Sequence, residues 1–268
     1  MAHDADDGAP PSIPPKQTFD YRTRDARRWA MLEKLFADQG MGFEQVLRDF
    51  PAFIRRRELP RFLAHAKLFE QVVDLPGCVV ELGVFKGSSL MTWANLMETF
   101  CPGDRFRMVY GFDHFGGLTD FAEEDGRQHD DRNQGKVEGG WKAPADIART
   151  LVKLFNEDTL VPNIPRVELV EGDVFETLPR FLEDHPGLKI SLLHLDVDLY
   201  KPTKYAFDML YPLVVEGGVV ILDEYGLVPW QGETKAIDEF FAGRDDRPVI
   251  RKFPYSATPS GYFVKGQR

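Results

Sequence analysis

The stretch Val80-Glu81-Leu82-Gly83-Val84-Phe85-Lys86-Gly87-Ser88-Ser89 decides the fold of this chain. It ends a buried apolar run of strand length, turns on two glycines and opens a helix, with Ser88 in a capping position. Gly83 lets the backbone pass close to a ligand, and Gly87 lets it turn into the helix. Neither the dinucleotide fingerprint Gly-x-Gly-x-x-Gly nor a phosphate-binding loop with its lysine is present. Because Glu81 would repel a pyrophosphate, the turn favours a cationic or amino-bearing ligand.

Downstream of this turn, short apolar runs alternate with stretches of helical periodicity. Such alternation predicts an α/β fold with a mostly parallel sheet, helices on both faces and ligands at the carboxyl ends of the strands. We predict seven strands, at residues 78–82, 108–112, 167–170, 190–195, 219–222, 249–252 and 262–264. We predict helices between them at residues 88–100, 145–155, 174–184, 203–210 and 234–241.

The chain is divided by composition. Residues 1–19 are rich in Asp, Gly and Pro and are expected to form a disordered leader. Residues 20–75 have apolar side chains at helical spacing, which predicts a helical N-terminal cap before the sheet domain at 76–268. The polar, glycine-rich segment 116–141 is interpreted as a lid.

Charge and cysteine content exclude several classes of protein. The 268 residues have a formal net charge of -10, which argues against a nucleic-acid partner because such binding needs Lys and Arg to neutralise phosphates. The basic group 55–57, with Arg61 close behind, is interpreted as a solvated helix end. Two cysteines are too few for a disulfide scaffold. With no signal peptide and no apolar stretch of membrane-spanning length, we expect a cytoplasmic protein without a membrane partner.

Acidic residues follow the second and third predicted strands. Asp113 comes directly after the second strand, where a carboxylate can accept hydrogen bonds from a ribose. Asp173 follows the third strand and can also act as the N-cap of the next helix. Both acids lie at the edge of the sheet where a ligand is expected.

The densest acidic pattern follows the fourth and fifth strands. Asp196 and Asp198 follow one buried run, and Asp223 and Glu224 follow the next. If these strands are neighbours, Asp196, Asp223 and Glu224 converge and need a counter-charge. All-oxygen ligands suit a hard divalent cation such as Mg²⁺. The alternative is that these acids are solvated caps at strand ends.

These motifs resemble a known family. The Glu-x-Gly-x-x-x-Gly turn resembles the S-adenosylmethionine-binding motif of class I methyltransferases, and the acidic motifs with the intervening 200–203 and 210–218 patterns resemble the macrocin-type (TylF) sugar O-methyltransferases. The resemblance spans roughly residues 79–240. It implies a Rossmann-like class I methyltransferase fold with S-adenosylmethionine as cofactor and Mg²⁺ on Asp196, Asp223 and Glu224. Where this chain has Glu224, many relatives have aspartate. The cofactor-binding residues expected from the turn, the strand ends and this resemblance are Glu81, Gly83, Val84, Gly87, Ser88, Asp113, Phe115, Asp173, Val174 and Asp196.

The expected reaction is transfer of the sulfonium methyl group to a hydroxyl of a small sugar-bearing acceptor, as in antibiotic biosynthesis. The cation would lower the pKa of the attacking hydroxyl and orient it. Asp196 is our candidate general base and His114 a rival. His194 lies on the same strand face as Asp196, but a satisfied core histidine is the favoured interpretation.

Three alternatives stay open at this stage. A catechol-type metal-dependent O-methyltransferase would use the same fold on a phenolic acceptor. A nicotinamide oxidoreductase is disfavoured by the missing glycine fingerprint. A non-catalytic small-molecule-binding protein on this fold is the third alternative, because fold alone does not establish activity. The helical N-terminal cap is a place where a homo-oligomer could form its subunit contacts.

Overall fold

The computed structural model describes residues 21–127 and 135–267, so the predicted leader lies outside the described residues. The chain divides into two compact units, residues 1–55 and 56–268. The described part of the first contains α1 (Tyr21–Gln39), α2 (Phe43–Arg48) and α3 (Phe50–Phe53). Within it, Arg28 donates a hydrogen bond to the carbonyl of Phe53, and the Phe36 and Phe53 rings meet edge to face. Among the described helices, none combines the length and apolar character needed to cross a bilayer.

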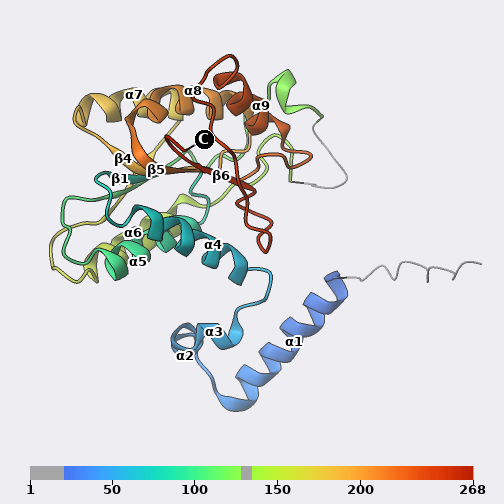
Figure 1. The fold of residues 1–268 in the computed structure, drawn as a ribbon. Coiled ribbons are helices and arrows are strands. Elements are labelled where there is room, and N and C mark those ends of the chain that lie inside the picture. The colour runs from blue at the N-terminus through green and yellow to red at the C-terminus, as the bar shows by residue number, and fades with distance from the viewer. Residues whose placement is uncertain (1–20, 128–134, 268) are drawn as a thin grey trace, which may run out of the picture. The chain divides into compact units, whose positions relative to one another are not determined.

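The second unit is built on a six-stranded sheet in the order β3-β2-β1-β4-β5-β6 (Figure 1). Neighbouring strands are parallel except β5 and β6, which are antiparallel. The predicted α/β fold with a mostly parallel sheet is therefore confirmed. The strands are β1 (Cys78–Leu82), β2 (Val109–Asp113), β3 (Val167–Glu171), β4 (Ile190–Leu195), β5 (Val214–Leu222) and β6 (Gly261–Val264).

The prediction of seven strands is wrong by one. Residues 249–252, predicted as a strand, contribute only an isolated bridge in which Arg251 and Tyr262 exchange two backbone hydrogen bonds of 2.8 Å. Pro248 and Pro254 flank this segment. Because proline has no N–H to donate, the pairing does not extend into a ladder.

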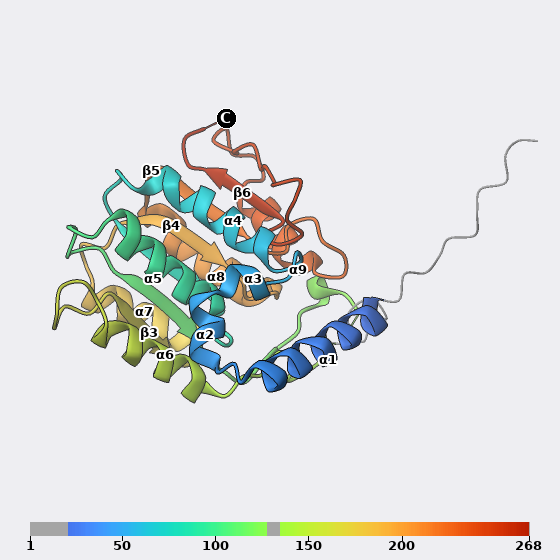
Figure 2. The ribbon, with the colours of Figure 1, turned by 90° about the horizontal axis from the view of Figure 1, so that it is seen from below.

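Helices cover both faces of the sheet (Figures 1 and 2). One face carries α4 (Leu59–Phe69), α5 (Ser88–Phe100) and α6 (Ala145–Glu157), and the other carries α7 (Val174–Asp184), α8 (Tyr200–Leu210) and α9 (Gln231–Phe240). Three short 3-10 helices, η1 (Glu70–Val72), η2 (Glu123–Asp125) and η3 (Tyr211–Leu213), lie in the connections. Alternate residues of each strand face opposite sides, so Val79 and Leu192 join one apolar cluster while Val80 and Leu193 join the other.

Two parts of the predicted domain plan look different in the structure. Helix α4, predicted as part of the N-terminal cap, packs against α5 in the same compact unit as the sheet. Of the predicted lid, residues 128–134 lie outside the described part. In the rest of the segment, two buried side chains form hydrogen bonds with the backbone. Asp125 accepts hydrogen bonds from the N–H groups of Ala122 and Tyr200. Lys136 donates to the carbonyls of Asp125 and Pro229.

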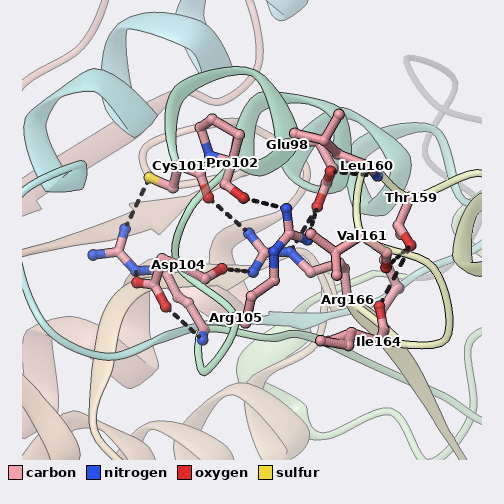
Figure 3. A network of polar contacts seen from close by, with 12 residues as sticks. Glu98, Cys101, Pro102, Asp104, Arg105, Thr159, Leu160, Val161, Ile164 and Arg166 are labelled. Atoms are coloured by element: carbon pink, nitrogen blue, oxygen red, sulfur yellow. Dashed lines mark hydrogen bonds and ion pairs between the residues drawn. The ribbon is translucent and has the colours of Figure 1, made fainter.

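A network of charged groups closes the edge of the sheet where β2 and β3 begin (Figure 3). The buried Arg166 guanidinium forms an ion pair of 2.9 Å with Glu98 and donates to the carbonyls of Asp104 and Cys101. Glu98 also pairs with Arg105 at 3.0 Å. This network joins the end of α5 to the start of β3, at the edge opposite the acidic strand ends.

Candidate functional site

The functional candidates gather where the strand order reverses. β1 has β2 on one side and β4 on the other, and in open α/β sheets this switch point is where ligands bind. Gly83 and Asp196 each follow the last residue of their strands here. The N–H of Asp196 donates to the carbonyl of Leu82 at 2.9 Å, and the N–H of Asp223 donates to the carbonyl of Leu195 at 3.1 Å. The fifth strand end therefore lies directly beside the fourth.

Arg61 lies between the two aspartates. Its guanidinium donates to Oδ2 of Asp223 at 2.8 Å, to Oδ2 of Asp196 at 2.9 Å and to the hydroxyl of Thr258 at 2.7 Å. The interpretation of Arg61 as part of a solvated helix end is therefore wrong. Arg61 is the third residue of α4, and it supplies a positive charge of the kind that the converging acids were expected to require.

His194 supplies a second positive charge beneath the aspartates. Its ring is fully buried, with Nε2 3.3 Å from Oδ1 of Asp223 and Nδ1 3.6 Å from Oε2 of Glu81. Burial opposes protonation, but the hydrogen bond to Asp223 and the negative charges of Asp223 and Glu81 outweigh it and raise the pKa of His194 to about 10. His194 is thus a charged core histidine near neutral pH, which leaves no lone pair to serve as a base.

Three further carboxylates complete the acidic cluster, which comprises Asp196, Asp198, Asp223, Glu224 and Glu233. Asp198 has a left-handed backbone with φ of 61°, and Glu233 on α9 accepts a hydrogen bond from the N–H of Glu224 at 3.1 Å. Burial, followed by the neighbouring aspartates, raises the pKa of Asp198, Glu224 and Glu233 well above the ordinary values. Sequence reasoning assigned no role to Asp198, Glu233 or Arg61. Only Asp198 carried a signal, its Asp-x-Asp spacing.

The two aspartates that contact Arg61 differ in acidity. Burial and the charge of Asp223 raise the pKa of Asp196 to about 7, although Arg61 opposes the shift. Burial would raise the pKa of Asp223 too, but Arg61 and His194 together overcome it and hold that pKa below the usual range. Asp223 is therefore the more firmly ionised of the pair.

The donor set fits a hard divalent cation. Among the described residues, one potential ligand atom from each of His194, Asp196 and Asp223 lies within 4.8 Å of the others. A protonated His194 cannot bind a metal ion, so the two aspartates are the usable donors of this group, and the predicted ligand Glu224 is not part of it. Oε2 of Glu224 and Oε2 of Glu233 are buried, and no donor among residues 21–127 and 135–267 reaches either oxygen. Buried carboxylate oxygens without a donor are costly unless a proton or a cation neutralises the group. Since oxygen ligands are those that Mg²⁺, Mn²⁺ and Ca²⁺ prefer, the cluster suits such an ion.

The turn after β1 needs glycine at position 83, as predicted, but the close approach is to the protein backbone and not to a ligand. Gly83 has φ of 91°, and a Cβ on it would lie 1.7 Å from the backbone oxygen of Asp196, so the close approach is to a neighbouring strand. Gly87, with φ of 85°, is the N-cap of α5, and the cap has no side-chain hydrogen bond. The prediction that Ser88 occupies the capping position is wrong: Ser88 is the first residue of α5. The side chain of Val84 is buried.

Glu81 lies beneath this turn with its side chain fully buried. It accepts a hydrogen bond of 2.8 Å from the hydroxyl of Ser89 and faces His194. In this arrangement Glu81 links the turn to the acidic cluster through the imidazolium.

Asp113 holds the same turn from the side of β2. Its Oδ2 accepts from the backbone N–H groups of Val84 at 2.9 Å and Phe85 at 2.7 Å, and its Oδ1 accepts from that of Phe115 at 2.6 Å. The neighbouring His114 is exposed, and its Nδ1 accepts from the N–H of Gly116. The carboxylate predicted to hold a ribose therefore positions the loop through three backbone hydrogen bonds.

Asp173 acts as the N-cap of α7, as predicted for one of its two roles. Its side chain accepts a hydrogen bond from the N–H of Phe175 at 2.9 Å. Asp173 is exposed, and the next residue, Val174, packs partly against the core. Asp173, Asp113 and Gly83 thus lie at or just after the ends of three adjacent strands, so an elongated ligand can lie along this edge.

A cavity of about 220 Å³ lies beside Arg61. Its lining comes from α4 and the two residues before it, from the N-terminal half of α5 and from the segment before β6. It includes Arg61, His65, Ser88, Thr92 and Thr258. The space therefore adjoins the start of α5, which follows the turn after β1, and Arg61, which contacts the acidic cluster.

This sheet order, turn and set of strand ends define a Rossmann-like fold of the class I methyltransferase type. A crystal structure of CalS11, a calicheamicin methyltransferase, matches with a TM-score of 0.80 and 28% identity over 99% of this chain and 100% of that one. An apo structure described as CalS11, a TDP-rhamnose 3'-O-methyltransferase of calicheamicin biosynthesis, gives 0.72 and 29% over 91% of this chain and 95% of that one.

Residues 55–251 match the family of Macrocin-O-methyltransferase (TylF), and the chain belongs to this family. Among curated relatives, the demethyldecarbamoylnovobiocin O-methyltransferase of Streptomyces niveus is 29% identical over 179 residues. That alignment covers 64% of this chain and 61% of the relative, so the chain spans less than two thirds of the relative's length. The resemblance read from the sequence motifs is thereby confirmed.

Proposed function

We propose that this protein is an S-adenosylmethionine-dependent O-methyltransferase that methylates a sugar hydroxyl of a small molecule. The observation that carries the proposal is the packing of the Gly83 turn against the backbone of Asp196. It brings the turn expected to bind the methyl donor beside the acidic cluster expected to bind the acceptor. The sugar-modifying activity named for CalS11 supports the choice of acceptor.

The residues along the strand ends would bind the donor. Asp173 and Val174 would contact the adenine, Asp113 and Phe115 the ribose, and the turn after β1 the methionine portion. A bound divalent cation, held by Asp196, Asp223 and Glu224, would supply Lewis-acid polarisation of neighbouring acceptor hydroxyls. Asp196 would accept the hydroxyl proton, since it lies next to the turn that positions the donor. His114, which is exposed nearby, is the second candidate for this step.

The test is methyl transfer with a panel of acceptors. Purified protein is incubated with S-adenosylmethionine and, separately, TDP-rhamnose, rhamnosylated aglycones and catechols, and methylated product is detected by mass spectrometry. We expect product from one of the sugar acceptors and loss of turnover in EDTA that Mg²⁺ restores. Turnover undiminished in EDTA would remove the cation from the proposal. Product from catechols alone would reassign the acceptor.

A matched pair of variants tests the site. Asp196→Asn removes the proposed base, and we expect turnover to fall by about 100-fold or more. Asp208→Asn changes an exposed aspartate on α8 and should leave turnover unchanged. Equal turnover of the two variants would place the chemistry elsewhere.

We also propose a homo-oligomer that uses the N-terminal helices. Within their own unit, Phe43, Leu47 and Phe50 of α2 and α3 remain mostly exposed. Apolar side chains that a unit does not cover are typical of association surfaces. Light scattering after size exclusion tests this, and a monomer at micromolar concentration would contradict it.

A further inference from the structure

We propose that Arg61 competes with the divalent cation for the acidic cluster, so that a metal ion binds only when the guanidinium leaves Asp196 and Asp223. The inference rests on the cation in the proposed function. It adds a role for a residue that the expected ligand set does not include.

The competition follows from shared atoms. Arg61 donates to Oδ2 of both Asp196 and Asp223, at 2.9 Å and 2.8 Å. Two of the three expected metal ligands are therefore engaged by the same side chain. A hard cation needs to approach carboxylate oxygens to about 2.0–2.6 Å. At that separation the ion would lie within a few ångströms of the guanidinium, and the two positive charges would repel each other.

Glu224 shows why the exchange is favourable for a cation. Its Oε2 is buried, and no described donor reaches it. Arg61 contacts the two aspartates but donates no hydrogen bond to Glu224. A divalent ion carries twice the charge of the guanidinium. Arg61 therefore neutralises only part of the negative charge of the cluster, and a divalent ion would neutralise more of it.

Room for the displaced side chain is also present. Arg61 lines the cavity of about 220 Å³ together with Phe62, Ser256 and Thr258. Thr258 already accepts a hydrogen bond from the guanidinium at 2.7 Å, so the side chain can turn toward this segment without losing all its acceptors. Long side chains change rotamers without backbone movement. Entry of the ion thus requires one side chain to move.

The experiment measures Mn²⁺ binding by electron paramagnetic resonance, independently of methyl transfer. Wild type is compared with Arg61→Met, which keeps the aliphatic stem and removes the charge. Arg56→Met is the matched control, because Arg56 is exposed. If Arg61 leaves the aspartates in about a tenth of molecules, Arg61→Met should bind Mn²⁺ about tenfold more tightly. Arg56→Met should bind like wild type.

If Arg61→Met fails to fold without metal, a second variant can be measured in its place. Arg61→Lys keeps the charge, but a lysine ammonium lacks the planar fork that bridges two carboxylates. We expect its Mn²⁺ affinity to lie between wild type and Arg61→Met. We also expect the melting temperature of Arg61→Met to be lower in EDTA and to rise again with Mg²⁺, because the ion replaces the missing charge.

The outcomes separate this inference from the proposed function. Equal or weaker Mn²⁺ binding by both Arg61 variants would overturn the competition, and so would the absence of Mn²⁺ binding by all of the proteins. Methylated product in the acceptor panel would still support the methyltransferase in either case. Tighter binding by the variants without any product would support the competition and count against the proposed reaction.

Discussion

The imidazole Nε2 of His194 lies 3.3 Å from Oδ1 of Asp223, in a fully buried pair. Because the pKa of His194 is raised to about 10, the ring is a cation that offsets Asp223 and Glu81. His194→Gln removes the charge and leaves buried acids behind. We expect the free energy of unfolding to fall by about 3–5 kcal/mol, measured by urea denaturation in EDTA. His114→Gln, at an exposed histidine, is the control and should unfold like wild type. A stable His194→Gln would show that the pair carries little of the stability.

Gly83→Ala tests the contact between β1 and β4. The new methyl group would lie 1.7 Å from the backbone oxygen of Asp196, which cannot move without shifting β4. We expect the free energy of unfolding to fall by more than about 4 kcal/mol, or the variant to fail to fold. Circular dichroism and thermal melting measure this.

Gly243→Ala is the control for this prediction. It introduces backbone strain without a clash, so the difference between the two variants gives the steric part of the effect at Gly83. Gly243 has a similar positive φ of 72°, but a Cβ there would meet nothing within 4 Å. Only backbone strain of about 1–2 kcal/mol is expected. If the two variants were equally stable, the clash at Gly83 would be relieved by local adjustment.

The elements of the sheet domain were predictable because their signals are local. The bounds of β1, β4, α5 and α7 agree with the predicted ranges, since hydrophobic periodicity and flanking turns determine them. The start of β5 was missed by five residues because Gly217-Gly218 is typical of a turn. In the structure both glycines pair with Lys265 through backbone hydrogen bonds.

The counter-charge of the candidate site could not be predicted in the same way. Asp196 and Asp223 were brought together by a simple rule, that parallel strands end at one edge. Arg61 is separated from them by 135 and 162 residues and belongs to a basic stretch that resembles a solvated helix end. Glu233 likewise has no distinguishing spacing, and only the packing of α9 brings it to Glu224. Contacts of this range depend on tertiary packing, which a single sequence does not encode as a pattern.

Arg166→Met tests the network at the opposite edge of the sheet (Figure 3). The buried guanidinium donates to the carbonyls of Asp104 and Cys101, and both would lose a donor. Glu98 would keep Arg105 as an ion-pair partner, so its charge would stay compensated. We expect a loss of about 2–4 kcal/mol in the free energy of unfolding, measured by urea denaturation.

Arg149→Met is the control for this prediction. Arg149 of α6 pairs with Glu171 at the end of β3, and its side chain is more than half exposed. Because solvent screens exposed ion pairs, we expect little change. Similar effects of the two substitutions would mean that the network in Figure 3 does not stabilise the fold more than a surface pair does.

Asp113→Asn separates positioning of the turn from a simple capping role. The Asp113 carboxylate accepts three backbone hydrogen bonds, from Val84, Phe85 and Phe115. An asparagine amide has only one oxygen, so its NH₂ group would face an N–H group on one side. We expect a loss of about 2–3 kcal/mol in the free energy of unfolding, since these bonds are made to a charged group. S-adenosylhomocysteine binding, measured by calorimetry, should weaken together with stability because the turn moves.

Asp173→Asn is the matched control, since asparagine caps a helix as well as aspartate does, and its stability should stay at the wild-type value. Weakened S-adenosylhomocysteine binding by Asp113→Asn at unchanged stability would instead assign the carboxylate to direct contact with the ligand.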